Sequence, residues 1–217
     1  MSVVAISSQM LSEWVNPENF FASAWVFIAV FMAIVVNIKP IERVVHKKAL
    51  LRDYALFVVL FGLFSILGTY AGVKGPDGSI SNFRDVAPIV AGLVAGPYVG
   101  LAVGLIGGVH RFFLGGISCI PCSLATVLIG LIAGLVYRLN RGRLLGLVTG
   151  MALALALELF HTGLALLLIQ PFSEAVNVVL NTFPPMIIIV PVGVGISIII
   201  LKLKEDLEQL KRRITAE

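Results

Sequence analysis

Two cysteines near the middle of the chain, Cys119 and Cys122, have the C-x-x-C spacing of thiol oxidoreductases and of half a zinc site. The sequence has no second cysteine pair, and only His110 is close enough in sequence to offer a third zinc ligand. A thioredoxin-like motif belongs at a strand-to-helix turn, whereas this one opens an apolar helix. The spacing leaves three interpretations open: pocket wall, redox-active pair or disulfide, and metal site.

Two arginines indicate a different chemistry, the binding of a small anion. Arg84 and Arg111 flank a glycine-rich apolar run. A guanidinium group presents planar, bidentate donors that match a carboxylate or a phosphate. If both side chains point into one pocket, their charges repel each other, and a bound anion relieves that repulsion. The pair therefore predicts an anion site.

Other ionisable residues also lie in or beside apolar segments, where an unpaired charge is costly. Glu158 and His161 are three residues apart on one helical face, so the alternatives are a buried structural pair and a proton-relay or ligand role. Asp85 follows Arg84 and could form a local ion pair with it. Asp53 opens an apolar segment, and we expect it to be an ordinary helix-start charge.

The composition indicates a membrane protein. Only 13% of the 217 residues are charged and 59% are hydrophobic, whereas soluble domains are about 25% charged. We expect an all-α, polytopic membrane helix bundle of five to six transmembrane segments in a bacterial inner membrane. The predicted segments are about 20–38, 54–73, 86–108, 120–137, 144–170 and 180–201. The N-terminus lacks a basic region and a cleavage site, so we expect no removable signal peptide.

Basic residues predict the orientation of this bundle. They cluster in 39–52, 138–143 and 202–213, which hold 13 of the 16 lysines and arginines. The positive-inside rule places all three clusters in the cytoplasm, and loops 74–85 and 171–179 outside. The net charge of +4 then records topology, and we expect no nucleic-acid partner.

This orientation places residue 84 outside and residue 138 inside, with two predicted apolar segments between them. Two full crossings would return the chain to the outside, which conflicts with this orientation. One segment must return to its own side, and the candidate is 86–108, which has Gly96-Pro97 near its centre. A helix breaks at such a pair, and broken helices are tolerated where they line a protein cavity. The alternatives are a broken or re-entrant element and one kinked spanning helix. The first brings Arg84 and Arg111 to the same outer side.

The C-terminal residues have a heptad spacing. Leu203, Leu207, Leu210 and Ile214 follow at intervals of four, three and four, with charges on the other faces. We expect a short signalling helix that joins two protomers into a homodimer, and the alternative is a solvated helix end. The predicted organisation is an extracytoplasmic N-terminus (1–19), a transmembrane domain (20–201) and a cytoplasmic coiled-coil-like linker (202–217).

Four stretches resemble the membrane sensor domain of the LytS type, the five-transmembrane receptor region of LytS-YhcK proteins. They are NFR at 82–84, GLVAGPYVGLAVGLIGGVHRFFLGG at 92–116, Cys122, and TVLIGLIAGL at 126–135. The likeness continues through 155–176. This domain occurs on LytS-like histidine kinases and on some diguanylate cyclases. Some members are associated with cell-wall control through a LytTR-type response regulator.

The resemblance implies a ligand. In pyruvate-sensing receptor kinases of this family, two arginines and a cysteine bind pyruvate, and these correspond to Arg84, Arg111 and Cys122. A serine used by those relatives falls at Ala125 here, and its neighbours Ser123 and Thr126 could substitute. The ligand therefore stays open among pyruvate, another short 2-oxo or hydroxy acid, and a different anion. The predicted ligand-binding set is Arg84, Arg111, Cys122, Asn82, Ser123, Thr126 and His110.

Together these features predict a ligand-sensing membrane domain without catalysis, cofactor or metal, in contact with membrane lipid. The sequence contains no kinase phospho-acceptor region, no ATP-binding glycine motif and no cyclase motif. We therefore expect either a sensor region whose output comes from a missing domain or a stand-alone sensor. The alternative is a small-molecule transporter or the substrate-binding subunit of an uptake system. A membrane redox enzyme has only the C-x-x-C spacing in its favour.

Overall fold

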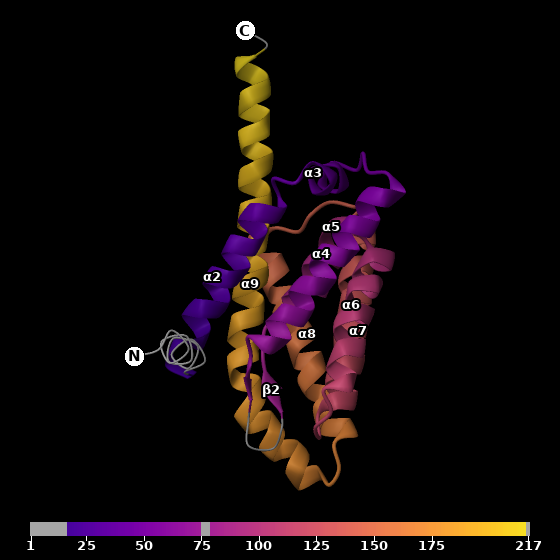
Figure 1. Cartoon of the computed structure of the whole chain (residues 1–217), viewed down its shortest axis with the longest axis vertical. Coiled ribbons are helices and arrows are strands. Elements are labelled where there is room, and N and C mark those ends of the chain that lie inside the picture. Colours follow the sequence, from indigo (N-terminus) through magenta and orange to yellow (C-terminus); the bar gives the residue numbers. More distant parts are fainter. Residues whose placement is uncertain (1–16, 75–78, 216–217) are drawn as a thin grey trace, which may run out of the picture.

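The computed structural model describes residues 17–74 and 79–215, and these are helical apart from one short hairpin and the connecting loops (Figure 1). The strands β1 (Val73–Lys74) and β2 (Ile80–Ser81) pair antiparallel. The helices are α2 (Pro17–Val35), α3 (Lys39–Val45), α4 (Leu51–Tyr70), α5 (Val86–Ala95), α6 (Pro97–Phe113), α7 (Cys119–Leu139), α8 (Leu147–Leu168) and α9 (Phe172–Ile214). The predicted extracytoplasmic N-terminus (1–19) lies mostly outside the described residues.

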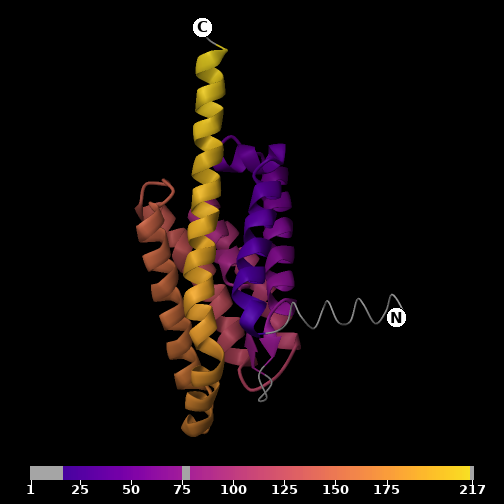
Figure 2. The ribbon, with the colours of Figure 1, turned by 90° about the vertical axis from the view of Figure 1, so that its left-hand side faces the viewer.

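Four of these helices, α4, α7, α8 and α9, are long and apolar enough to cross a membrane. Helices α2 and α3 form a pair bent by 94° that together make a fifth candidate span. Figure 2 shows these helices side by side, with α9 extending beyond the rest. The predicted fold class, an all-α polytopic membrane bundle, is confirmed.

The third apolar segment is broken where the sequence predicts. Helix α5 ends at Ala95, Gly96 adopts a left-handed φ of 89°, and α6 begins at Pro97. The two helices fold back on each other, because a Cβ on Gly100 would lie 2.8 Å from the Cα of Gly92. A single kinked helix would keep residues eight positions apart about 12 Å from each other. The structure therefore has the re-entrant form.

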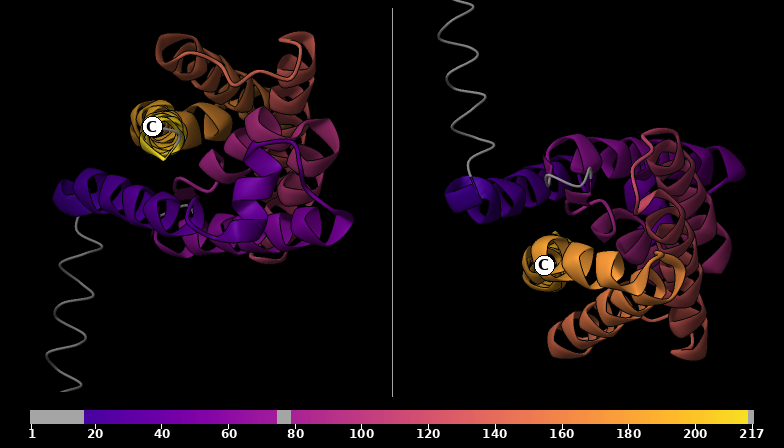
Figure 3. Two further views of the ribbon diagram at one scale, coloured as in Figure 1. Left: turned by 90° about the horizontal axis from the view of Figure 1, so that it is seen from above. Right: turned by 90° about the horizontal axis from the view of Figure 1, so that it is seen from below.

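The re-entrant helix α5 forms the centre of the bundle. All residues of 86–94 are buried, and α5 packs against α4, α6, α7 and α9. The views along the bundle show these helices surrounding it (Figure 3). Its continuous apolar sequence has no polar face because no side of the helix meets water.

Two element boundaries differ from the prediction. Helix α6 continues to Phe113, so His110 and Arg111 lie in its last turn and not in the following loop. Helix α9 begins at Phe172 and runs through three internal prolines, which replaces the predicted start at residue 180. Prolines are tolerated inside membrane helices because neighbouring groups satisfy the freed carbonyls. The predicted signalling helix is thus the continuous end of the last transmembrane helix.

The two ends of the bundle differ in character. The β1–β2 hairpin and the α8–α9 turn lie at one end, called here the hairpin end (Figure 1). Helix α3 and the free end of α9 lie at the opposite end, called here the α3 end. A cavity at the α3 end is lined by Lys47, Arg143 and Lys202, one from each basic cluster. The charge separation predicted from the sequence is therefore present along the bundle.

Asp53 has a larger role than an ordinary helix-start charge. It does begin α4, and its Oδ2 accepts a hydrogen bond of 2.9 Å from the Leu50 amide. Its side chain is also buried, at 1% exposed, and both carboxylate oxygens accept from the Arg43 guanidinium, with Nε to Oδ2 at 2.8 Å. This pair ties α3 to α4.

Candidate anion site

Arg84 enters the bundle interior directly before α5 and is fully buried. Its Nε donates to the Thr126 hydroxyl on α7 at 2.8 Å. Its Nη1 and Nη2 are also buried, and neither has a hydrogen-bond partner among the described residues. A buried guanidinium group with two unsatisfied nitrogens is costly unless a ligand completes its hydrogen bonds.

Asn82 positions Arg84. Its Oδ1 accepts from the Arg84 backbone amide at 3.1 Å, and its Nδ2 donates to the Ile80 carbonyl at 2.7 Å. Gly68 on α4 allows the segment to approach, because a Cβ there would lie 3.1 Å from the Arg84 backbone. Asn82 therefore uses both ends of its amide to shape the turn into α5.

The hydroxyl of Thr126 connects several parts of the interior. It accepts from Arg84, and its own hydrogen can be donated to Asp85 Oδ1 at 2.7 Å or to the Cys122 carbonyl at 2.9 Å. The neighbouring Ala125 is fully buried and supplies no polar atom. Thr126 is therefore the hydroxyl that faces the arginine from this part of α7.

Arg111 is also fully buried and is held by the loop that follows α6. Its Nη1 donates to the Gly115 carbonyl at 2.6 Å and its Nη2 to the Ser118 hydroxyl at 2.9 Å, whereas its Nε has no partner within residues 17–74 and 79–215. Ser118 is not among the site residues predicted from the sequence. Its place directly before an apolar helix suggests a helix cap, but the structure gives its hydroxyl to the arginine.

Cys122 is buried on α7, close enough to both arginines for their charges to act on it. Its side chain is 3% exposed, and its thiol interacts electrostatically with both guanidinium groups and with His161 on α8. Cys119 is partly exposed, and both cysteines are free thiols. The structure therefore separates the two members of the C-x-x-C motif, with Cys122 in the interior and Cys119 toward its edge.

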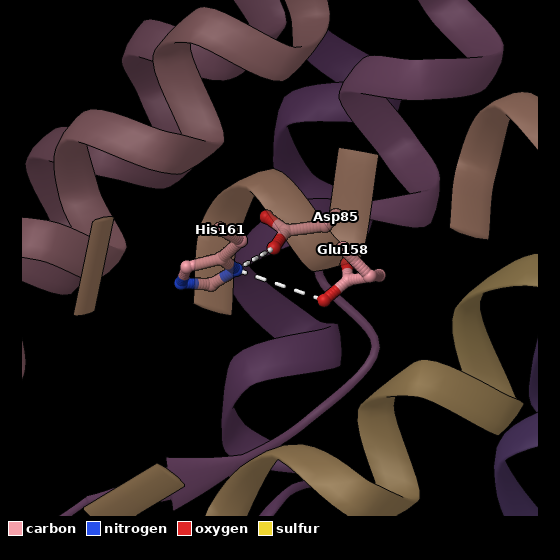
Figure 4. Close-up of side chains that lie close together, drawn as sticks. All are labelled: Asp85, Glu158 and His161. Carbon is pink, nitrogen blue, oxygen red and sulfur yellow. Dashed lines mark ion pairs between the residues drawn. The ribbon is translucent and has the colours of Figure 1, made fainter. Parts of the chain in front are cut away.

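Three buried ionisable side chains adjoin this interior (Figure 4). The Nδ1 of His161 lies 3.1 Å from Asp85 Oδ2 and 3.7 Å from Glu158 Oε2, so the imidazole faces both carboxylates. Asp85 Oδ1 also lies 3.5 Å from Arg84 Nε. The expected pairing of Glu158 with His161 is present, but the nearer partner of the imidazole is Asp85.

These three residues have the donor set of a metal site, with ligand atoms within 4.8 Å of one another. Their surroundings do not favour a cation. The Nε of Arg84 lies 3.5 Å from Asp85 Oδ1, so one of the three ligand groups already has a cationic partner. A positive charge so close to the group in a low-dielectric interior weakens its attraction for a metal ion.

Two comparisons with known proteins bear on this site. A family model described as the 5TMR of 5TMR-LYT matches residues 38–204. The chain belongs to the 5TMR-LYT family. The resemblance to the LytS-type five-transmembrane sensor domain is thereby confirmed, and the domain is a transmembrane sensor region.

The curated relatives of this 5TMR-LYT domain are sensor proteins by name, and some of them are sensor histidine kinases. It is 34% identical over 151 residues to the sensor histidine kinase BtsS of Escherichia coli (strain K12), which covers 67% of this chain and 27% of BtsS. It is 29% identical over 197 residues to the sensor protein LytS of Bacillus subtilis (strain 168), which covers 81% of this chain and 32% of LytS. The chain thus spans about a third or less of these relatives. No solved structure matches it.

The structure places the predicted site residues of this 5TMR-LYT domain in two groups. Arg84, Arg111, Cys122 and Thr126 meet in the interior. The others lie around it: Asn82 shapes the turn, the Ser123 backbone faces Gly108 on α6, and His110 lies 5.1 Å from the Tyr70 ring between centroids.

A cavity of 230 Å³ opens at the hairpin end, above the loop that holds Arg111. Its lining comes from the end of α4, the hairpin and the loop after α6. It includes Tyr70, which contacts His110, and Gly116, which lies between the two loop partners of Arg111. This cavity is the candidate entrance to the anion site.

Proposed function

We propose that this domain senses a small carboxylate, such as pyruvate or another short 2-oxo or hydroxy acid. The ligand enters from the hairpin end and binds between Arg84 and Arg111, with Cys122 and Thr126 beside it. The observation that carries the proposal is the pair of buried Arg84 nitrogens, Nη1 and Nη2, that have no partner in the described part of the chain. A carboxylate accepts from two such nitrogens in a bidentate geometry.

The size and charge of the site favour a short ligand. The interior around Arg84 is closely packed, because Gly107 and Gly68 bring α6 and α4 against it without room for side chains. The Nε of Arg111 has no partner among the described residues, so it can donate to a second oxygen of a compact acid. The thiol of Cys122 and the Thr126 hydroxyl supply weaker polar contacts.

Two connections link this site to the last helix. The Ser79 hydroxyl lies 2.6 Å from the Thr182 hydroxyl on α9, which ties the segment leading to Arg84 to that helix. His161 faces Asp85 on one side and packs edge-on against Phe183 of α9, with ring centroids 4.9 Å apart. A carboxylate on Arg84 competes with Asp85 and thereby alters the contacts of His161. The signal reaches α9 only if the ligand prefers one of two arrangements.

In this proposal, the signal of ligand binding is transmitted along α9. Its extension leaves Leu203, Leu207, Leu210 and Ile214 exposed along a heptad seam, and pairing of two such seams would form a homodimer. The protein lies in the bacterial inner membrane with this end in the cytoplasm, as the basic clusters favour. Since the named relative BtsS is a sensor histidine kinase, the output in this proposal is a kinase acting on a response regulator, of the LytTR type by family resemblance.

A thermal-shift and calorimetric screen of short carboxylates on the purified domain tests the proposal. Wild-type protein should be stabilised by at least one acid, with pyruvate first in the series. Pyruvamide, the neutral amide of the same size, should have no effect because it lacks the charge. Arg84→Ala and Arg111→Ala should each lose the response, whereas Arg52→Ala, an exposed arginine at the α3 end, should keep it.

If no acid stabilises the wild type, or if the two site variants respond as the wild type does, the two-arginine pocket is wrong. The transporter alternative has its own signature. Proteoliposomes containing this chain would then accumulate a labelled acid, whereas a sensor domain binds the acid without uptake.

A further inference from the structure

The α3 end contains a second site whose chemistry differs from that of the anion site. A cavity of 330 Å³ lies there among the loop after α3, the tip of α5, the α7–α8 loop and the turn of α9 at residues 201–205. These elements come together only because α5 descends to this end and turns at Gly96. The cavity is therefore a product of the re-entrant fold.

Three cations line this cavity, each from a different loop or helix: Lys47, Arg143 and Lys202. None of the three has an ion-pair partner within the described chain, whereas Lys204, two residues further along α9, pairs with Glu208 at 3.4 Å. The lining includes a single carboxylate, that of Glu205. Three cations and one carboxylate leave the cavity lining with an excess of positive charge.

The geometry of the loops holds these charges near one another. Lys47 adopts a left-handed φ of 57°, and its Nζ lies 5.9 Å from the centroid of the Tyr137 ring. Gly142 also has a left-handed φ, and a Cβ there would lie 3.0 Å from the same Nζ. The α7–α8 loop therefore leaves room for the lysine to reach over the tyrosine into the cavity mouth.

The rest of the lining is apolar. Leu93 and Val94 at the tip of α5, Leu144 after the α7–α8 loop and Leu201 on α9 form the walls. A cavity with a cationic mouth and apolar walls, at the level where membrane helices give way to basic loops, matches a phosphate group joined to hydrocarbon.

We propose that this cavity binds the phosphate group of an anionic phospholipid. The bound lipid contacts the tip of the re-entrant element and the base of the α9 extension at once. It therefore fixes the position of α9 relative to α5, the two parts that a ligand at the anion site would move. The binding itself does not depend on the function proposed above, because it uses other residues at the other end of the bundle.

Native mass spectrometry of the full chain released from nanodiscs tests the proposal. The nanodiscs contain phosphatidylcholine alone or with phosphatidylglycerol. Wild-type protein should retain phosphatidylglycerol. The triple variant Lys47→Gln/Arg143→Gln/Lys202→Gln should bind it about a hundredfold more weakly, since each cation near an anionic surface contributes about a fivefold effect.

A matched control changes the same net charge outside the cavity. Lys48→Gln/Arg138→Gln/Lys211→Gln removes three exposed cations at the same end, and it should retain phosphatidylglycerol as the wild type does. Equal loss in both triple variants would show a general attraction to charge and would overturn the proposal, as would full retention in the cavity variant.

A second arm identifies the source of the phosphate. Inorganic phosphate is added to the protein in phosphatidylcholine, and thermal stability is measured. No stabilisation by phosphate, together with retained phosphatidylglycerol, supports the lipid. Stabilisation by phosphate that the cavity variant abolishes, without retained lipid, overturns the lipid and assigns the site to a soluble phosphate compound. In either case both triple variants should bind the carboxylate normally.

Discussion

The chain contains two arginine–aspartate pairs in which the aspartate is buried. They differ in how completely the guanidinium is bonded, and in the exposure of the arginine side chain, which is 37% for Arg43 and 0% for Arg84. In the Arg43–Asp53 pair, two guanidinium nitrogens meet both carboxylate oxygens, and the Leu50 amide adds a further hydrogen bond to the aspartate. In the Arg84–Asp85 pair, only Nε approaches the carboxylate, at 3.5 Å, and Nη1 and Nη2 have no partner in the described chain. The first pair is complete and the second is not.

The difference separates a structural role from a binding role. The complete pair, Arg43–Asp53, joins α3 to α4, and we expect no ligand to bind it. An incomplete pair in the interior keeps strong donors available, and a bound ligand that accepts from them offsets the cost of burying them. The same two residue types therefore have opposite expected consequences when they are mutated.

The largest effect is expected for Arg84→Gln. It removes two charge-assisted hydrogen bonds to the ligand, each contributing about 1.5–3 kcal/mol, so carboxylate affinity should fall by about a hundredfold or more. Arg43→Gln should lower the melting temperature and leave affinity unchanged. Isothermal titration calorimetry and thermal unfolding in detergent measure the two quantities. If Arg43→Gln weakened the ligand as much, the two pairs would not be distinct.

The next effect concerns the re-entrant turn that positions Arg84. Gly100→Ala places a methyl group 2.8 Å from the Gly92 Cα and closer still to the Gly130 carbonyl, and such overpacking costs about 1–3 kcal/mol. Melting temperature and carboxylate affinity should both fall, since Arg84 lies directly before α5 and Arg111 lies on α6. Gly163→Ala on α8, where no atom lies within 4 Å of the added methyl, is the matched control. Equal stability of the two variants would contradict the re-entrant packing.

Much of this arrangement follows from local sequence. Gly96-Pro97 predicts the break because proline lacks a backbone donor and glycine permits the left-handed turn. The basic clusters predict which loops share an end of the bundle. Arg84 and Arg111 are conspicuous because arginine is rare between apolar segments. Each of these signals lies within a few residues of the feature that it predicts.

The partners of these residues could not be predicted in the same way. Asp85 meets His161 on α8, and Arg43 meets Asp53 across a helix boundary. Such contacts depend on how each helix is rotated and tilted, which hydrophobic periodicity leaves undefined when a helix is apolar on all sides. The start of α9 at Phe172 could not be predicted either, because prolines in a sequence ordinarily indicate that a helix ends.

A smaller effect of the opposite sign is expected for Asp85→Asn. The substitution removes a negative charge that competes with the ligand for Arg84, so carboxylate affinity should rise by about tenfold. Asp53→Asn removes a charge that has no ligand to compete with, and it should only lower the melting temperature. Titrations of both variants against the wild type measure this. A loss of affinity in Asp85→Asn would mean that the aspartate supports the ligand instead of opposing it.

Variants of Thr126 test whether its neutral hydroxyl holds Arg84 of the incomplete pair in place. Thr126→Val keeps the shape of the side chain and removes the hydroxyl that accepts from Arg84 Nε, so affinity should fall by about three- to tenfold, the equivalent of one neutral hydrogen bond. Thr126→Ser restores the hydroxyl and should restore most of the affinity. Failure of the serine variant to recover would assign the effect to packing of the methyl group.

The smallest effects on carboxylate affinity are expected at the two cysteines, and only one of the two should show an effect. Cys122 lies in the interior beside both arginines, whereas Cys119 is partly exposed one helical turn away. Cys122→Ser should therefore weaken the carboxylate by about three- to tenfold, within the range of one hydrogen bond, and Cys119→Ser should leave affinity and stability unchanged. Both variants are measured with and without a reducing agent. If Cys119→Ser or reduction altered ligand affinity, the C-x-x-C motif would act as a redox pair, and the anion site would be under thiol control.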